Sequence, residues 1–206
     1  MTLYENWILP PLLDWAMRQR QVERYRVSLI PAARGHVLEI GVGSGLNLPH
    51  YGAGVTRIVG LDPSARLLSI ARRRAGRATA PVDLIEGSAA AIPLGDASVD
   101  TLVMTWALCS IPDPQAALAE MRRVLKPGGA LLFVEHGLSP EPAVARWQRR
   151  LTPFWRPFAG GCRLDRKMDD LIRAGGFAIA ELKEGYAHGL RPLTYMYQGR
   201  AVSSLS

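Results

Sequence analysis

The chain has 206 residues, of which 48% are hydrophobic and 21% are charged. This length suits one domain with a substantial core, and no stretch reaches the roughly 20 apolar residues of a membrane-spanning helix. We expect no secretory signal, because no charged n-region is followed by an apolar h-region. We expect no disulfide framework, because the chain has only two cysteines, Cys109 and Cys162. Cysteines and histidines show no metal-ligand spacing along the chain, so no metal site is predicted. The composition predicts a cytoplasmic protein, either free or peripheral to the inner face of the membrane.

Arginine carries nearly all of the net charge of +7, and it clusters at 72–74, at 122–123 and between 146 and 150. A basic face of this kind can attract nucleic acid or anionic lipid headgroups. No nucleic-acid module accompanies the arginines, which makes nucleic acid a disfavoured partner. The simpler interpretation is a solvated helix face. Membrane contact and the oligomeric state stay open at this point.

The first 30 residues are predicted to be helical. A helix opens at Pro10 and Pro11, because proline is tolerated in the first helical turn, and Tyr4, Asn6 and Trp7 precede it. We expect residues 1–30 to form a helical lid segment and residues 31–206 to form the main domain.

From Val37 onward, apolar strand-like runs alternate with helix-like segments, which predicts an α/β fold with a mostly parallel sheet covered on both faces. The predicted strands are 37–40, 57–61, 82–85, 101–105, 130–135, 177–183 and 193–198. A predicted helix begins near Leu46, and further helices are predicted at 63–77, 114–125, 141–151 and 165–174, with an irregular segment at 152–166. The last two strands should pair as an antiparallel hairpin, which gives a Rossmann-like, seven-stranded sheet.

The most informative stretch is 37–45, which reads VLEIGVGSG. An apolar run containing Glu39 leads into Gly41, Gly43 and Gly45, and glycine both accepts a positive φ and lets the backbone approach a ligand closely. A dinucleotide fingerprint would need glycine at Leu46, and a P-loop would need a following Lys-Ser/Thr pair, so neither motif fits. On this pattern alone, a glycine-rich turn in another kind of α/β domain is the alternative.

The second predicted strand ends at Asp62. An acidic residue at this strand tip binds ribose hydroxyls in Rossmann-like folds. The alternative is that Asp62 caps the helix that follows it. Because the carboxyl ends of parallel strands share one edge of a sheet, Gly41, Asp62, Ser88, Thr105 and His136 are expected to gather there.

With these landmarks the chain resembles the class I S-adenosylmethionine (SAM) methyltransferases over almost its full length. Motif I at 39–45 and motif II at Asp62 are followed in the family's order by EGSAAAIPL at 86–94, SVD at 98–100 and RVLKPGG at 123–129. The family usually has an acid where Ser88 stands, and a neutral hydroxyl bonds the adenine amino group more weakly, while the Ala89 backbone N–H can serve the same ring.

This resemblance implies SAM as methyl donor and S-adenosylhomocysteine as product. It assigns cofactor binding to a set of residues at the sheet edge: Glu39, Gly41, Gly43, Gly45, Asn47, Asp62, Pro63, Ser88, Ala89, Thr105 and Trp106.

A narrower resemblance is to the animal thiol S-methyltransferases of the methyltransferase-like group. It is carried by LCSI at 108–111, FVEH at 133–136, Trp147, PFW at 153–155 and GC-x-L-x-R at 161–166. The animal members carry an N-terminal membrane anchor, which we do not expect here, and bacterial relatives are often phospholipid N-methyltransferases or quinone-type C-methyltransferases. The resemblance implies a small hydrophobic acceptor, best a thiol or sulfide, with a lipid amine or a quinone as the alternative. The non-enzyme alternative is a SAM-binding regulatory protein.

His136 is the candidate general base, because it follows the fifth strand directly, and its alternative role is packing or capping at the strand end. Cys109 is either a catalytic thiol or a small buried one. The candidate acceptor-binding residues are mostly aromatic and come from the N-terminal segment and from residues 147–166: Tyr4, Trp7, Trp147, Trp155, Cys162 and Arg166. For the aromatic residues between 147 and 158, the alternative is a hydrophobic core that packs beneath a loop.

Overall fold

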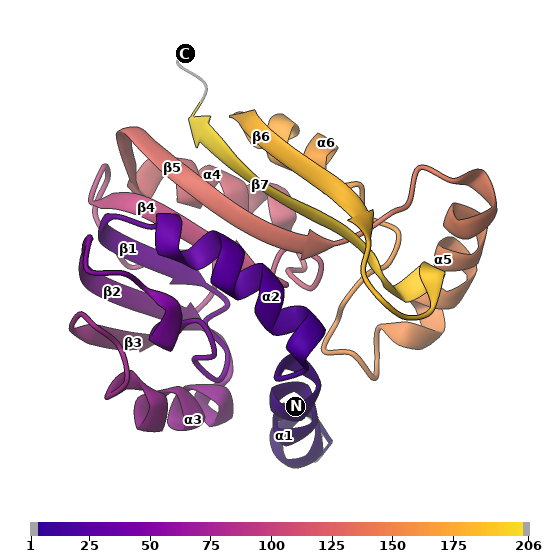
Figure 1. Cartoon of the computed structure of the whole chain (residues 1–206), viewed down its shortest axis with the longest axis horizontal. Helices are drawn as coiled ribbons and strands as arrows, with labels where there is room; N and C mark the ends of the chain where they lie inside the picture. The colour runs from indigo at the N-terminus through magenta and orange to yellow at the C-terminus, as the bar shows by residue number, and fades with distance from the viewer. Residues whose placement is uncertain (1–3, 204–206) are drawn as a thin grey trace.

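The computed structural model of the chain describes residues 4–203. Its strands form one seven-stranded sheet in the order β3-β2-β1-β4-β5-β7-β6 (Figure 1). Pairing is parallel from β3 through to β5, and β7 is antiparallel to both β5 and β6. This arrangement confirms the predicted Rossmann-like class and its antiparallel C-terminal pair. The strands are β1 (Gly35–Ile40), β2 (Val55–Asp62), β3 (Val82–Glu86), β4 (Val99–Thr105), β5 (Leu125–His136), β6 (Phe177–Tyr186) and β7 (Tyr195–Ser203).

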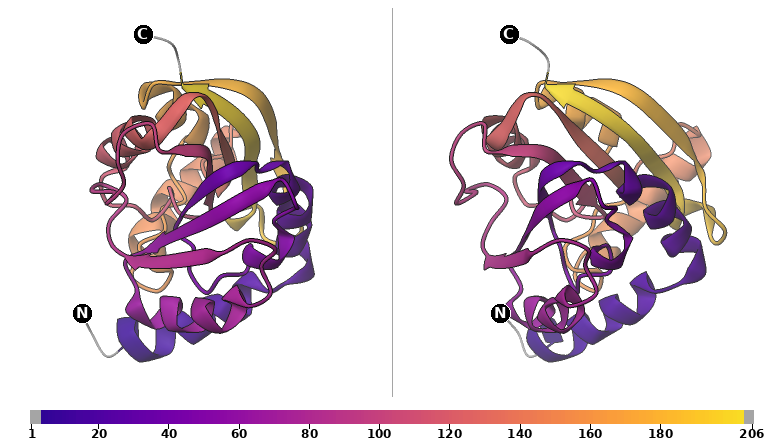
Figure 2. Two further views of the ribbon diagram at one scale, coloured as in Figure 1. Left: turned by 90° about the vertical axis from the view of Figure 1, so that its left-hand side faces the viewer. Right: turned by 60° about the vertical axis from the view of Figure 1, so that its left-hand side comes forward.

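Helices cover both faces of this sheet, with α2 on one face and α4 and α6 on the other (Figures 1 and 2). The α-helices are α1 (Leu9–Met17), α2 (Arg20–Leu29), α3 (Ala65–Ala75), α4 (Pro114–Val124), α5 (Pro142–Trp155) and α6 (Met168–Ala174). Shorter turns are the π-helical η1 (Tyr4–Ile8) and the 3-10 helices η2 (Ile30–Ala32), η3 (Leu48–His50) and η4 (Arg191–Leu193).

The two faces of the sheet build two separate cores. Side chains alternate between faces along a strand, so Val37 lies in the core under α2 and α3, while Leu38 and Ile40 lie in the core under α4 and α6. All three are at most 1% exposed. This double burial explains why the central strands read as continuous apolar runs.

Helix α4 shows how local sequence sets an element on this frame. Asp113 is its N-cap and accepts a 3.0 Å hydrogen bond from the Ala116 backbone N–H, and Pro114 occupies the first turn. Its buried residues recur at helical spacing and form one face: Ala117, Leu118, Met121 and Val124.

The predicted helix beginning near Leu46 is wrong, because only the short 3-10 helix η3 follows the glycine turn. Pro49 supplies no backbone N–H, and Gly52 and Gly54 follow closely, so a regular α-helix is interrupted before β2.

The predicted irregular segment at 152–166 is wrong at its start, because α5 continues through Pro153 to Trp155. Pro153 is exposed, so the carbonyl that loses its helical partner there lies on the solvent side. Two starts differ from the prediction by three residues or more. Helix α6 begins only at Met168, and β5 begins at Leu125, which already pairs with Val99.

The carboxyl ends of the parallel strands face α5, and α1 lies along the same side of the molecule (Figures 1 and 2). Strands β1, β2, β4 and β5 end at Ile40, Asp62, Thr105 and His136, so the predicted site residues do gather at this edge. Within residues 4–203, no helix combines the length and the apolar character that crossing a bilayer requires.

Candidate active site

The turn after β1 is built by glycines in the left-handed region. Gly41, Gly43 and Gly45 have φ values of 69°, 54° and 78°. A Cβ added to Gly41 would lie 2.7 Å from Ala107 Cβ, whereas one added to Gly43 would meet only a carbonyl oxygen at 3.8 Å. Gly41 is therefore needed for close packing against the turn after β4. Gly43 leaves open space beside its backbone, where a ligand could approach closely.

Asp62 ties the tip of β2 to that turn. Its Oδ2 accepts from the Gly43 backbone N–H at 2.9 Å, and its Oδ1 accepts from the Ser64 backbone N–H at 2.8 Å. Burial raises the pKa of Asp62, and the two backbone bonds oppose that rise. The N-cap of α3 is Ser64, whose hydroxyl accepts from the Leu67 backbone N–H, so the capping alternative for Asp62 is wrong.

Beneath the glycine turn lies a buried polar network centred on Asn47. Its Nδ2 donates to Glu39 Oε1 at 2.8 Å and to Thr105 Oγ1 at 2.9 Å, while its Oδ1 accepts from Arg26 Nε at 3.0 Å. The second Glu39 oxygen accepts from Tyr51 Oη at 2.8 Å. Sequence reasoning named Glu39, Asn47 and Thr105 but missed Arg26 and Tyr51, which no motif marks.

Burial sets the electrostatics of this network. It raises the pKa of Glu39 to about 7, against the hydrogen bonds from Tyr51 and Asn47, and it lowers the pKa of Arg26 to about 10. Both groups are at most 4% exposed. The hydrogen bonds of Asn47 therefore connect the loop after β1 to the end of β4.

Trp106 turns the chain sharply at the end of β4. Its φ is 51°, a conformation that costs a bulky residue about 1–3 kcal/mol. Its ring packs edge-on against Tyr25 at 6.1 Å, and the Arg26 guanidinium lies over it at 5.0 Å. Helix α2 thus stabilises a strained turn beside the glycine turn.

Glu135, which sequence reasoning did not assign to the site, organises the residues after Trp106. It is fully buried on β5, and its carboxylate accepts from the backbone N–H groups of Ala107, Leu108 and Cys109 at 2.8, 2.9 and 3.2 Å. Burial raises its pKa well above the ordinary value. Glu135 therefore fixes the loop that presents Cys109.

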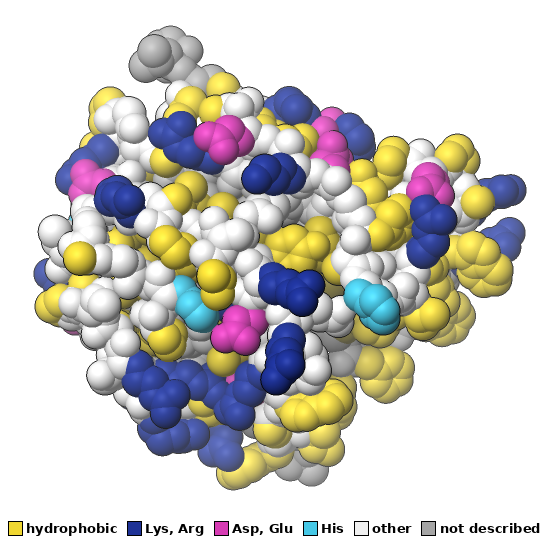
Figure 3. Space-filling view, in the orientation of Figure 1, with side chains coloured by type: hydrophobic (Ala, Val, Ile, Leu, Met, Phe, Trp, Pro, Cys, Tyr) yellow, Lys and Arg dark blue, Asp and Glu magenta, His cyan; other side chains and the backbone are white. Residues whose placement is uncertain are grey.

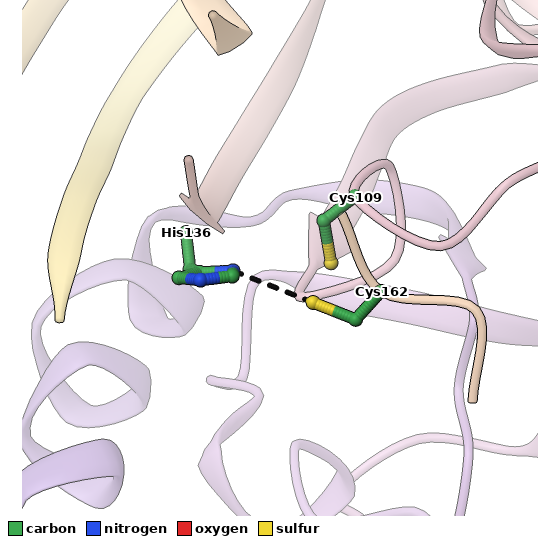
Figure 4. Close-up of side chains that lie close together, drawn as sticks. All are labelled: Cys109, His136 and Cys162. Atoms are coloured by element: carbon green, nitrogen blue, oxygen red, sulfur yellow. Dashed lines mark hydrogen bonds between the residues drawn. The ribbon is translucent and has the colours of Figure 1, made fainter. Parts of the chain in front are cut away.

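Cys109, His136 and Cys162 converge at the carboxyl ends of β4 and β5 (Figure 4). Cys162 Sγ and His136 Nδ1 lie 3.5 Å apart, and the three ligand-type atoms all lie within 4.8 Å of one another. Hydrogen bonding between the thiols, then burial, raises the pKa of Cys109, and the same bond lowers the pKa of Cys162. Both cysteines are free.

Trp155 and Arg166 border this cluster. The Trp155 indole N–H is buried, and its proximity to the Cys162 thiol contributes to the lowered pKa of that group. Arg166 donates to the backbone carbonyls of Leu108 and Ile111. Arg166 thus braces the loop after β4.

The N-terminal segment reaches both sides of the sheet edge. On one side, Asp14 pairs with Arg74 of α3 at 2.6 Å, and Arg74 also donates to the Ser44 carbonyl in the glycine turn at 2.7 Å. On the other side, Tyr4 Oη donates to the Phe158 carbonyl at 2.9 Å. Trp7 lies against α3, with the Arg66 guanidinium 5.1 Å from its ring centroid.

Four further predicted residues lie at the margin. Ser88 is exposed, and its hydroxyl accepts from the Ala90 backbone N–H at 3.2 Å, while Ala89 is half-buried. Pro63 is exposed directly after Asp62, and Trp147 is exposed on α5. The fixed centre of the site is therefore the glycine turn, Asp62 and the loop after β4.

Comparison with known proteins assigns this arrangement to a class. A methyltransferase domain family matches residues 38–133. Human thiol S-methyltransferase TMT1B is 33% identical over 173 residues, which cover 78% of this chain and 68% of that protein. Phosphatidylethanolamine N-methyltransferase of Cereibacter sphaeroides is 32% identical over 153 residues, covering 73% and 74%.

Solved structures agree on the fold. The putative methyltransferase in complex with the Haloferax volcanii Trm112 activator has a TM-score of 0.74 at 19% identity, over 100% of this chain and 99% of that chain. A SAM-dependent methyltransferase of Thermotoga maritima has a TM-score of 0.67 at 24% identity, over 98% and 100%.

The fold and the glycine-turn site define a class I, Rossmann-like methyltransferase. The chain belongs to the SAM-dependent methyltransferase family. SAM is the methyl donor of this family, and membership of it supports an enzyme over a SAM-binding regulatory protein. The matched thiol S-methyltransferases are longer, since the match covers 62% of the rat and 68% of the human TMT1B protein.

Proposed function

We propose that the enzyme transfers the SAM methyl group to a small hydrophobic thiol or sulfide. The observation that carries the proposal is the position of His136 at the end of β5, where its ring meets two sulfur-bearing side chains, Cys109 from the loop after β4 and Cys162. Thiol S-methyltransferases among the relatives, at 31–33% identity, support the same acceptor class.

The reaction is a displacement at the methyl carbon. The acceptor sulfur must lie in line at about 3–3.5 Å from that carbon, and such positioning removes several kcal/mol from the barrier. A free thiol has a pKa near ~8.5, so a modest base suffices to remove its proton. We assign that step to His136. Cys109, at 2% exposed, shapes the wall of the acceptor pocket.

Cofactor binding is assigned to the glycine turn and the strand tips. Asp62 accepts from the ribose hydroxyls, Gly43 admits the nucleoside, and Ala89 and Ser88 flank the adenine. Glu39, Asn47, Thr105 and Trp106 hold the methionine end. In this assignment Glu39 acts through Asn47, since both of its oxygens already accept hydrogen bonds.

Residues 1–30 are assigned the role of a lid. The contacts from Asp14 to Arg74 and from Tyr4 to Phe158 connect the nucleoside side of the sheet edge to the α5 side. Tyr4, Trp7 and Trp155 then supply apolar surface above the acceptor, which excludes water from the transfer step.

A panel of alkyl and aryl thiols with SAM tests the acceptor class, with thioether formation measured by mass spectrometry. We expect turnover on hydrophobic thiols, and the Asp62→Ala variant serves as a cofactor-deficient control. Turnover confined to a lipid amine or a quinone would overturn the thiol assignment.

The second candidate is methylation of a lipid headgroup amine. Large apolar side chains are exposed on η1 and α1, and on α5 with the turn that follows it: Trp7, Ile8, Leu12, Trp15, Trp147, Phe154 and Phe158. Hydrophobic side chains gather at the lower and right margins of the molecule, and a group of Lys and Arg side chains lies at the lower left (Figure 3). This pattern and the phosphatidylethanolamine N-methyltransferase relative favour an enzyme that binds a bilayer surface and methylates a lipid there.

Flotation with anionic liposomes tests this candidate. Binding that is lost at high salt, combined with turnover on phosphatidylethanolamine, would support it over the thiol assignment. Liposome binding without turnover on that lipid would leave the thiol as acceptor.

A further inference from the structure

Cys109, His136 and Cys162 come from three separate segments and still meet in one place (Figure 4). Hydrogen bonds from neighbouring residues tie the three segments together. Glu135 accepts from the Cys109 backbone N–H, and the Arg163 N–H donates to the Cys109 carbonyl at 3.0 Å. His136 is the last residue of β5 and pairs with Met196 of β7. The cluster is therefore built by the fold.

The separation of Cys162 Sγ and His136 Nδ1 matches two ligands of a tetrahedral metal, and Cys109 Sγ lies close enough to be a third ligand. Zinc bonds of ~2.3 Å to sulfur and ~2.0 Å to nitrogen place the two ligand atoms about 3.5 Å apart at a tetrahedral angle. Cys162 Sγ and His136 Nδ1 lie 3.5 Å apart, and Cys109 Sγ completes a group within 4.8 Å. A simple cysteine–histidine pair would not require a second thiol at this distance.

We propose that Cys109, His136 and Cys162 bind one Zn²⁺ ion and leave its fourth position open. Two thiolates and an imidazole are ligands that zinc prefers, and three protein ligands with one open position is the pattern of catalytic zinc. Glu135 is excluded as the fourth ligand, because both of its oxygens accept backbone hydrogen bonds.

The open position suits the acceptor, a role that rests on the proposed thiol methylation. A thiol that binds the metal releases its proton to water, and its sulfur then attacks the SAM methyl carbon. A carbon–sulfur bond forms as the sulfonium bond breaks, so S-adenosylhomocysteine leaves with that electron pair. In the zinc-loaded enzyme His136 is a metal ligand and no longer the general base. The metal then lowers the pKa of the acceptor thiol.

Metal content and cobalt substitution test the site without measuring turnover. The purified chain should retain about one zinc per molecule, and Co²⁺ should give thiolate charge-transfer bands with visible bands typical of tetrahedral cobalt. The chain has only two cysteines, so such bands must come from Cys109 and Cys162.

Cys162→Ser and His136→Gln should each weaken zinc binding by at least roughly 100-fold in a competition assay with a chromogenic chelator. The matched control is His188→Gln, since His188 is exposed, and it should bind zinc like the parent chain. Calorimetry with SAM on each variant confirms that the fold persists.

Sub-stoichiometric zinc in the parent chain, or cobalt bands that survive Cys162→Ser, would overturn the proposal. So would isolation with no free thiols, which would indicate a disulfide instead. A zinc site without thiol turnover would overturn the proposed acceptor and keep the metal site, so the two failures are distinguishable.

Discussion

Asp62, at the tip of β2, accepts a 2.9 Å hydrogen bond from the backbone N–H of Gly43. This bond joins two loops that come from neighbouring strands, and it orients a carboxylate that is only 6% exposed. In the proposed cofactor site, the same oxygen atoms would accept hydrogen bonds from the ribose hydroxyls.

Removing that carboxylate should weaken SAM binding. Asp62→Ala deletes a charged acceptor, which is worth about 1.5–3 kcal/mol, so the dissociation constant measured by calorimetry should rise roughly 10- to 100-fold. The control is Asp83→Ala, an exposed carboxylate on β3 that pairs with Arg57. Equal affinity in the Asp62 variant would refute the ribose assignment.

A methyl group at Gly41 should disrupt the glycine turn. Gly41→Ala places a Cβ at a φ of 69° and 2.7 Å from Ala107 Cβ, so we expect a stability loss of about 1–3 kcal/mol and weaker SAM binding. Gly95→Ala is the matched control, since a Cβ there meets nothing within 4 Å. Thermal unfolding with and without SAM measures both effects, and identical curves for the two variants would contradict the packing argument.

Glu39 should make stability depend on pH. Its folded pKa of about 7 lies above the ordinary value of 4.5, so the folded state holds a proton that the unfolded chain releases. Stability should therefore fall as pH rises from about 4.5 to 7, by up to roughly 3 kcal/mol, and stay level above that range.

Glu39→Gln should remove this fall, as measured by urea unfolding at a series of pH values. Glu181→Gln, at an exposed position on β6, should keep the parent slope. A Glu39→Gln curve parallel to that of the parent would show that Glu39 does not titrate in this range.

Glu135 should be essential to the loop after β4. Glu135→Gln replaces an acceptor with an amide donor that faces three backbone N–H groups, and an unsatisfied buried group costs about 1–3 kcal/mol. Chemical unfolding should show this loss, and hydrogen exchange should quicken at Ala107, Leu108 and Cys109. Unchanged exchange at those amides would mean that Glu135 does not hold the loop.

The Asp14–Arg74 pair should control cofactor release. Asp14→Asn breaks a two-bond contact to Arg74, a residue whose side chain is 14% exposed, so SAM should dissociate several-fold faster in stopped-flow displacement. The control is Asp96→Asn, since Asp96 pairs with Arg123 while 79% exposed and contributes little. Equal release rates in the two variants would argue against the lid.

The sequence by itself determined the fold class, the cofactor and the sheet edge that carries the site. Gly41, Gly43 and Gly45 are local signals, because each reports a backbone conformation that its own residue type permits. Asp62 is equally local, since its place at a strand end follows from chain order alone. The helix predicted to begin near Leu46 does not form, because Pro49 and the glycines beyond it interrupt a regular helix.

Only the tertiary structure decided which side chains meet. Arg26 reaches Asn47, Glu135 reaches the loop before Cys109, and Cys162 reaches His136 across intervals of 21, 26 and 26 residues. No spacing along the chain encodes such contacts. They arise because parallel strands bring their carboxyl ends to one edge, where residues distant in sequence share a single buried volume.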